Sequence, residues 1–219
     1  MSSPVRSAAA SISDRLRKAG VVPVVELPEA DLAVPLAEAL VAGGLSCVEI
    51  TFRTPSAQAG LEAIREAYPE MLLGAGTVLD EEQLSVAQSA GADFVVSPGT
   101  NPELVRACLA RDIAILPGVC TPSEIETARG LGLRTLKFFP AEPIGGASFL
   151  RALCGPYRDV SFVPTGGITV RTLADYLALP QVLACGGSWM VKPEVLNERR
   201  FDRVRDLAEE ATAVVRGSR

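Results

Sequence analysis

Short apolar runs rich in β-branched residues alternate with longer amphipathic stretches along the whole chain. The apolar runs predict strands at residues 21–27, 47–52, 72–78, 94–97, 113–119, 135–139, 161–165 and 182–185. After the second run, Ala57, Leu61, Ile64 and Tyr68 recur at spacings of four, three and four, which is the period of one helix face. Strands that alternate with helices in this way predict repeated βα units and a parallel sheet.

Helix boundaries are marked by local signals as well. Asp80 with Gln83, and Thr121 with Glu124, have the spacing of capping boxes, in which a side chain bonds backbone N–H groups at a helix start. Glycines such as Gly132 fall where the predicted helices should stop. These stops close each unit at about two dozen residues, a usual βα length.

Eight such units favour a parallel sheet closed into a (β/α)8 TIM barrel, which we expect to form a single domain over residues 1–219. An extra N-terminal helix over residues 8–18 is expected to cap the bottom of the barrel. The rival is an open doubly wound sheet that binds a dinucleotide, because Gly74 and Gly76 resemble its glycine turn. Leu79 stands where that motif needs its third glycine, so these glycines are interpreted as admitting substrate near the third strand.

Composition narrows the classes of partner. The chain has 219 residues, of which 48% are hydrophobic and 21% charged, and this suits one large core. The net charge of −5 argues against a nucleic-acid or anionic-membrane surface, so a small metabolite is the expected partner. No run has the length of a membrane span and the first residues lack the apolar core of a signal peptide, so we expect a cytoplasmic protein. Five cysteines without a Cys-x-x-Cys pattern indicate reduced thiols.

Histidine is absent from the sequence. The chain therefore cannot build a Ser-His-Asp or Cys-His relay, nor a histidine-rich metal site. Acid-base chemistry must fall to carboxylates, lysine, tyrosine or water. An all-oxygen magnesium site stays open but is disfavoured, because few Asp and Glu residues follow the predicted strands. We expect neither a metal nor an organic cofactor.

Lys137 is one of only three lysines, with Lys18 and Lys192, and it lies in the apolar segment LKFFPAE at residues 136–142. An amine among apolar neighbours is easier to deprotonate, because burial disfavours the charged form, and it can then attack a carbonyl to form a Schiff base. This is the leading hypothesis. The alternative is a structural lysine that reaches water or pairs with a carboxylate.

Three strand ends place further polar groups near this amine. Glu49, Thr51 and Arg53 alternate on one face of the second predicted strand, and Lys137 would point into the same barrel interior. A structural pair between Glu49 and Arg53 remains an alternative. Paired glycines follow the seventh and eighth predicted strands, where barrels often hold a phosphate with backbone N–H groups, and Gly166 opens the first of these pairs.

Several segments together resemble the bacterial 2-keto-3-deoxy-6-phosphogluconate (KDPG) aldolase and 4-hydroxy-2-oxoglutarate (KHG) aldolase family. They are VEITFRT at 48–54, GAGTV at 74–78, SPG at 97–99, KFFPAE at 137–142, PTGGI at 164–168 and GGSW at 186–189. The likeness runs from about residue 12 to the last helix. It implies a class I, metal-independent aldolase on a (β/α)8 barrel, a lyase that is usually a homotrimer and acts in the Entner-Doudoroff pathway.

The resemblance also implies roles for individual residues. Lys137 matches the Schiff-base lysine and Glu49 the acid-base group, while Arg53 and Thr77 match the groups that bind the carboxylate of the pyruvate half. Phe139 is expected beside the reacting carbons. The expected phosphate end comprises Gly166, Gly167, Gly187 and Ser188. Two positions bear on how close the match is: Cys120 stands where close relatives carry serine, and Thr165 favours the gluconate-type over the galactonate-type enzymes.

Three alternatives remain at this point. The first is an aldolase for the galactonate epimer. The second is a phosphate-binding barrel isomerase or epimerase, in which Lys137 would have no covalent role. The third is a non-catalytic barrel that binds a phosphorylated sugar acid, which would have no reason to retain both Lys137 and Glu49.

Overall fold

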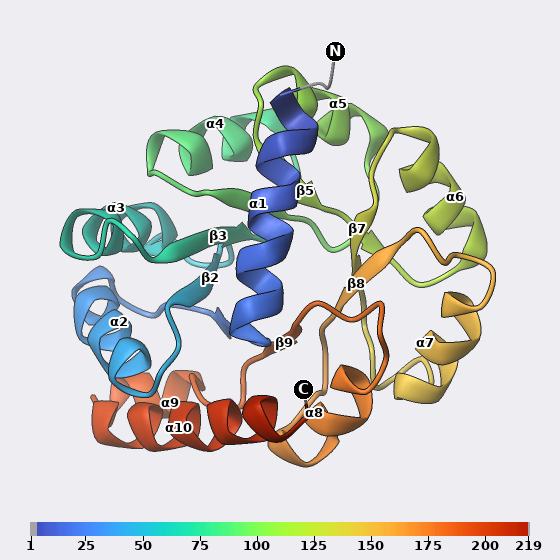
Figure 1. Cartoon of the computed structure of the whole chain (residues 1–219). Coiled ribbons are helices and arrows are strands. Elements are labelled where there is room, and N and C mark those ends of the chain that lie inside the picture. The colour runs from blue at the N-terminus through green and yellow to red at the C-terminus, as the bar shows by residue number, and fades with distance from the viewer. Residues whose placement is uncertain (1–3, 219) are drawn as a thin grey trace.

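Parallel strands and helices alternate through residues 4–218, the part of the chain that the computed structural model describes (Figure 1). The strands are β1 (Val21–Val25), β2 (Cys47–Thr51), β3 (Leu72–Gly76), β4 (Phe94–Val96), β5 (Ala114–Leu116), β6 (Gly118–Val119), β7 (Thr135–Phe138), β8 (Ser161–Pro164) and β9 (Cys185–Gly187). The helices are α1 (Pro4–Ala19), a 3-10 turn (Ala30–Leu32), α2 (Ala33–Ala42), α3 (Ala57–Ala67), α4 (Glu81–Ser89), α5 (Pro102–Ala110), α6 (Pro122–Gly130), α7 (Gly146–Cys154), α8 (Val170–Leu177), α9 (Pro193–Asn197) and α10 (Phe201–Gly217). The alternation predicted from the sequence is therefore present.

The strands form two parallel sheets that curl toward each other. One has the order β5-β4-β3-β2-β1-β9 and the other the order β6-β7-β8. The chain crosses from β5 to β6 at Pro117, whose carbonyl accepts a hydrogen bond from the Lys137 N–H. On the far side, Leu183 N–H donates to the Phe162 carbonyl at 2.9 Å. The order is sequential from β1 to β5, and the last strand, β9, lies on the other side of β1. A doubly wound sheet instead reverses its strand order beside the first strand, so that alternative is wrong.

Most strands end one or two residues earlier than predicted, and two strands differ more. The expected strand 113–119 is divided, because Pro117 has no N–H to donate to the ladder. The expected strand 182–185 lies later, at Cys185–Gly187, and Val182 makes only an isolated bridge to Phe162. The register explains the shift, since β9 pairs with Val21, Val22 and Pro23 of β1 through Cys185, Gly186 and Gly187. The ladder therefore continues into the glycines.

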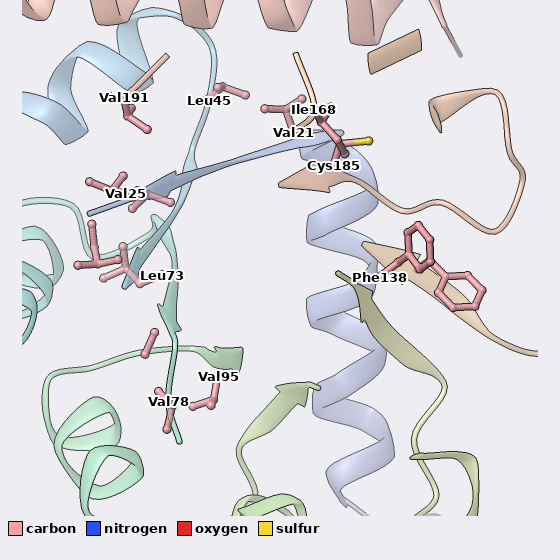
Figure 2. Packing of buried hydrophobic residues seen from close by; sticks show 14 of the residues in the cluster. Val21, Val25, Leu45, Leu73, Val78, Val95, Phe138, Ile168, Cys185 and Val191 are labelled. Atoms are coloured by element: carbon pink, nitrogen blue, oxygen red, sulfur yellow. The ribbon is translucent and has the colours of Figure 1, made fainter. Parts of the chain in front are cut away.

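Alternate residues of the strands pack into two separate apolar clusters. Leu73 and Val95 belong to a large cluster with the surrounding helices, part of which is shown in Figure 2. Their neighbours Leu72 and Phe94 belong to a smaller cluster that also contains Leu16 of α1. Because successive strand residues point to opposite faces, the smaller cluster fills the side of the sheet that α1 covers. In Figure 1, α1 runs across the strands while the other helices lie around them.

Among the helices of the described residues, none has the length and apolar content needed to cross a membrane.

The sheet sets the positions of the predicted site residues. Each strand's carboxyl end leads into a turn before the next helix, and the turns after β2, β7, β8 and β9 carry most of the predicted site residues. The fold thus brings together segments that are far apart in the sequence.

Candidate active site

Lys137 of β7 and Glu49 of β2 face each other inside the curled sheet. The Lys137 Nζ lies 3.7 Å from Glu49 Oε1, and the two side chains are only 6% and 5% exposed. This separation is an ion-pair distance and exceeds that of a hydrogen bond. Among the described residues, Glu49 Oε1 has no hydrogen-bond partner although it is fully buried. The site therefore holds a sheltered amine beside a carboxylate oxygen with free accepting capacity.

The strand ladders hold both groups in place. Glu49 pairs in register with Val24 of β1 and Gly74 of β3, and Lys137 pairs with Gly118 and Val163. The backbone at these two residues is fixed, because each of their strands is hydrogen-bonded to a neighbour on both sides. The alternative of a lysine that reaches water is wrong, since the Lys137 side chain is buried, whereas its pairing with a carboxylate is present.

The glycines of β3 make room for neighbouring side chains. A Cβ at Gly76 would overlap the Glu49 carboxylate, and a Cβ at Gly74 would overlap the Phe94 ring. The structure thus gives these glycines a packing role, and our interpretation that they admit substrate stays a prediction. Gly76 is required by the position of Glu49, and Gly74 by the packing of Phe94 below it.

A cavity of about 410 Å³ opens at the carboxyl ends of the strands. Seven of the predicted site residues line it: Arg53, Phe139, Thr165, Gly166, Gly167, Gly187 and Ser188. Glu49 and Lys137 line a much smaller cavity, and Thr165 lines both. Thr165 thus lies at the boundary of both cavities. The Lys137 Nζ lies 5.0 Å from the centroid of the Phe139 ring, which links the amine to the larger cavity.

Arg53 follows β2 at the wall of the larger cavity and is half exposed. Its Nε donates a hydrogen bond of 3.2 Å to Thr77 Oγ1, so the two residues predicted to bind a carboxylate lie together. Thr77 has φ of 58°, a left-handed conformation that is costly for a β-branched residue and must be held by its surroundings. Glu26 Oε2 lies 3.9 Å from Arg53 Nη1 and lines the same cavity. Sequence reasoning missed Glu26, although it is a charged residue at the end of the first apolar run.

Two glycine turns form the opposite wall. Gly166 and Gly167 have φ of 107° and 80°, values that glycine adopts without a steric penalty. The backbone there can come close to a ligand because no side chain intervenes. Near Gly187, a Cβ would overlap the ring of Trp189. Trp189 was missed as well: it lines the cavity, and its indole N–H is buried without a hydrogen-bond partner in the described part of the chain.

Other reactive groups are less suited to catalysis. Burial raises the pKa of the Cys47 thiol to about 12, despite the nearby Arg15, so the thiolate is not available near neutral pH. Within residues 4–218, no group of three or more carboxylate or thiol side chains is placed to hold a metal ion. Lys137 and Glu49 are therefore the pair whose geometry fits chemistry on a carbonyl compound.

Comparison with known proteins agrees with this geometry. The family model described as KDPG and KHG aldolase matches residues 12–207. The chain is 48% identical over 205 residues to the 2-dehydro-3-deoxy-phosphogluconate aldolase of Treponema pallidum, covering 94% of this chain and 98% of that protein. It superposes with a TM-score of 0.87 on the KDPG aldolase of Zymomonas mobilis ZM4 with 3-phosphoglycerate, at 41% identity over 94% of this chain and 97% of that one.

A second solved structure bears on the chemistry. The KDPG aldolase of Legionella pneumophila, with pyruvate captured at low pH as a covalent carbinolamine intermediate, has a TM-score of 0.88 and 38% identity. The match covers 91% of this chain and 97% of that one. The resemblance seen in the sequence motifs is thereby confirmed over nearly the whole length. This chain belongs to the KDPG and KHG aldolase family.

Proposed function

We propose that this chain is a class I aldolase, a lyase that reversibly cleaves KDPG to pyruvate and glyceraldehyde 3-phosphate through an imine on Lys137. The observation that carries the proposal is the buried amine of Lys137 lying 3.7 Å from the Glu49 carboxylate, beneath a cavity at the strand ends. Family membership supports it. The carbinolamine in the Legionella relative is the kind of intermediate that this chemistry requires.

The first half of the reaction builds an electron sink. The Lys137 amine attacks the C2 ketone of the substrate and forms a carbinolamine. Glu49 moves protons, directly or through one water, as the carbinolamine loses water and becomes a protonated imine. The low exposure of both side chains favours this step, because a shielded site strengthens their electrostatic interaction with the reacting atoms.

The second half breaks the carbon–carbon bond. Glu49 removes the proton of the C4 hydroxyl, the C3–C4 bond breaks, and its electron pair flows into the imine to give an enamine. Glyceraldehyde 3-phosphate leaves. Protonation of the enamine at C3 and hydrolysis of the resulting imine release pyruvate and restore the Lys137 amine. The same steps in reverse form the bond.

Different walls of the cavity bind different parts of the substrate. Arg53 binds the carboxylate of the pyruvate half with its planar fork, and Thr77, hydrogen-bonded to Arg53, helps to orient it. Phe139 packs beside the reacting carbons, and Thr165, which lines both cavities, contacts the substrate. The phosphate lies against Gly166, Gly167, Gly187 and Ser188, which line the other wall.

The finer architecture belongs to the same proposal. Two hydrogen bonds, from Lys137 N–H to the Pro117 carbonyl and from Leu183 N–H to the Phe162 carbonyl, connect the two sheets at their edges. They favour one closed eight-stranded (β/α)8 barrel that forms a single domain, with α1 covering its bottom. We infer a homotrimer that works in the cytoplasm without metal or organic cofactor, as the family resemblance implies.

The substrate range is the next part of the proposal. The family description includes KHG as well as KDPG, so cleavage of KHG to pyruvate and glyoxylate is a second activity to assay. The galactonate epimer of KDPG differs at C4, where Thr165 is the residue to vary. An isomerase would leave Lys137 unmodified, so covalent trapping separates it from an aldolase.

The test is mass spectrometry after incubation with pyruvate and sodium borohydride, followed by peptide mapping. The chain has only three lysines, and Lys192 also lines the larger cavity, so the map must distinguish it from Lys137. We expect an adduct on the peptide that contains Lys137. Lys137→Arg should abolish the adduct and lower kcat by at least about 10³-fold, as loss of a covalent catalyst does.

Lys192→Arg is the matched control, since it changes an exposed lysine of the same cavity without touching the buried pair. It should keep the adduct. An adduct confined to Lys192, or none under conditions where pyruvate binds, would overturn the aldolase mechanism and bring the isomerase alternative forward.

A further inference from the structure

A buried tyrosine on α8 is bonded to a carboxylate in the loop after β7. Tyr176 is fully buried, and its hydroxyl donates a hydrogen bond of 2.5 Å to Glu142 Oε1. Burial, and then the hydrogen bond to Glu142, raise the pKa of the Tyr176 hydroxyl above its ordinary value, so it stays protonated and can donate. Hydrogen bonds to a charged acceptor in a sheltered place are among the stronger ones in proteins.

Glu142 in turn is attached to the glycine turn that follows β8. Its backbone N–H donates to the Gly166 carbonyl at 2.9 Å, and the preceding Ala141 N–H donates to the Thr165 carbonyl at 2.8 Å. Its Cβ lies so close to Gly167 that a Cβ added there would come within 2.7 Å. Gly166 and Gly167 line the larger cavity, whereas Tyr176 does not. The hydrogen bond to Glu142 therefore connects Tyr176 to this part of the cavity wall.

Lys137 is held by different contacts. Its backbone N–H donates to the Pro117 carbonyl at 3.0 Å, and it pairs in register with Gly118 and Val163. None of these bonds involves Glu142 or Tyr176. A disturbance of the Tyr176–Glu142 bond should thus move the glycine turn and leave the amine in place.

We propose that Tyr176 is a positioning residue for phosphate recognition: through Glu142 it fixes the turn at Gly166 and Gly167 in the shape that receives the phosphate of the substrate. The inference rests on the proposed function, because it assigns that turn to the phosphate. It adds a residue outside the cavity to the determinants of affinity for a phosphorylated substrate.

The experiment compares a phosphorylated ligand with an unphosphorylated one in Tyr176→Phe, a variant that removes only the hydroxyl. The KM for KDPG should rise roughly tenfold, the effect of losing one well-placed interaction with a charged group. The pyruvate concentration that half-saturates borohydride trapping on Lys137 should stay within about twofold, because pyruvate has no phosphate.

Tyr157→Phe is the matched control. Like Tyr176, Tyr157 is buried and lies outside the cavity lining, and its hydroxyl donates to a different glutamate, Glu126, at 3.1 Å. Tyr157→Phe should leave the KM for KDPG and the half-saturating pyruvate concentration unchanged. Glu142→Gln keeps an oxygen that can accept from Tyr176 and should preserve a KM near that of the parent, whereas Glu142→Ala should reproduce the Tyr176→Phe result.

Two results would overturn the inference while the proposed function stands. One is an unchanged KM for KDPG in Tyr176→Phe with an active parent. The other is an equal rise for KDPG and pyruvate, which would show a general disturbance of the site. A parent chain that neither traps pyruvate nor cleaves KDPG would instead overturn the proposed function, and this inference with it.

Discussion

The lower and upper parts of the site are built differently. In the lower part, Lys137 and Glu49 project from paired strands and are 6% and 5% exposed. In the upper part, Arg53 follows a strand end with 48% of its side chain exposed, and the opposite wall consists of glycine turns. The groups proposed for bond making and breaking thus lie within strands, whereas those proposed for recognition lie just after strand ends, except Gly187 at the end of β9.

This difference has a physical reason. A covalent mechanism needs its amine and its acid-base group within a narrow range of positions, and a strand ladder holds them there. Recognition of a carboxylate and a phosphate tolerates more movement, and turns can change without disturbing the core. Substitutions in the lower part should therefore lower kcat, and substitutions that reach the upper part should raise KM.

Glu49→Gln tests the lower part and should have the largest effect of the four substitutions discussed here. The amide cannot accept the protons that the mechanism assigns to Glu49, so kcat for KDPG cleavage should fall by roughly 10²- to 10⁴-fold with little change in KM. Steady-state assays of aldehyde release measure both constants. Thermal unfolding is the control for a folding defect. A loss of less than about threefold would contradict the acid-base role.

Two glycine substitutions on β3 compare, within a single strand, a change that reaches Glu49 with one that does not. Gly76→Ala places a methyl group against the Glu49 carboxylate, so it should lower kcat by roughly tenfold through misplacement of that group. Gly74→Ala presses on the Phe94 ring instead, so it should lower stability by about 1–3 kcal/mol through overpacking and leave kcat nearly unchanged. Both variants need kcat and urea unfolding measurements. Equal effects on kcat would show that the strand, and not Glu49, was disturbed.

Glu124 lines neither of the two cavities, so Glu124→Gln should have the smallest effect. Glu124 caps α6: its carboxylate accepts hydrogen bonds from the Cys120 N–H at 2.7 Å and the Thr121 N–H at 2.8 Å. Partial burial on its own would raise the pKa of Glu124, but these hydrogen bonds and that from the Thr121 hydroxyl outweigh it and lower the pKa below its ordinary value. The substitution should cost about 1 kcal/mol at neutral pH and leave kcat unchanged.

The pH dependence of this cap has a definite sign. A carboxyl whose pKa is lower in the folded state stabilises the fold above its unfolded pKa of about 4.3, and this contribution is lost as the pH falls through the folded pKa. The stability difference between parent and Glu124→Gln should therefore shrink below about pH 4. Urea unfolding at pH 7 and at low pH measures it. A difference that grows on acidification would contradict the assignment.

Much of the fold and the centre of the site could be predicted from local pattern. The alternation of apolar runs and amphipathic stretches predicted the βα units, and the capping box at Thr121 and Glu124 is present as expected. Lys137 was identified because an amine within an apolar strand is unusual, and Glu49 because the two-residue period of a strand places it on the inward face. These signals depend on neighbouring residues in the chain.

Other features had no local signal. The shift of the last strand to Cys185–Gly187 follows from its register with β1, at the other end of the sequence. The role of Gly76 depends on a carboxylate that lies on a different strand. The hydrogen bond between Tyr176 and Glu142 joins α8 to the loop before α7, and no motif around either residue in the sequence predicts it.

The sequence by itself determined the local elements, the absence of histidine chemistry and the presence of an amine within an apolar segment, since these depend on residue type and short-range spacing. The tertiary structure decided which side chains meet. Sheet register and curl bring Lys137 to 3.7 Å from Glu49 and place Thr77 against Arg53. Such contacts depend on the packing of the whole chain, because one change of register turns every side chain of a strand to the other face.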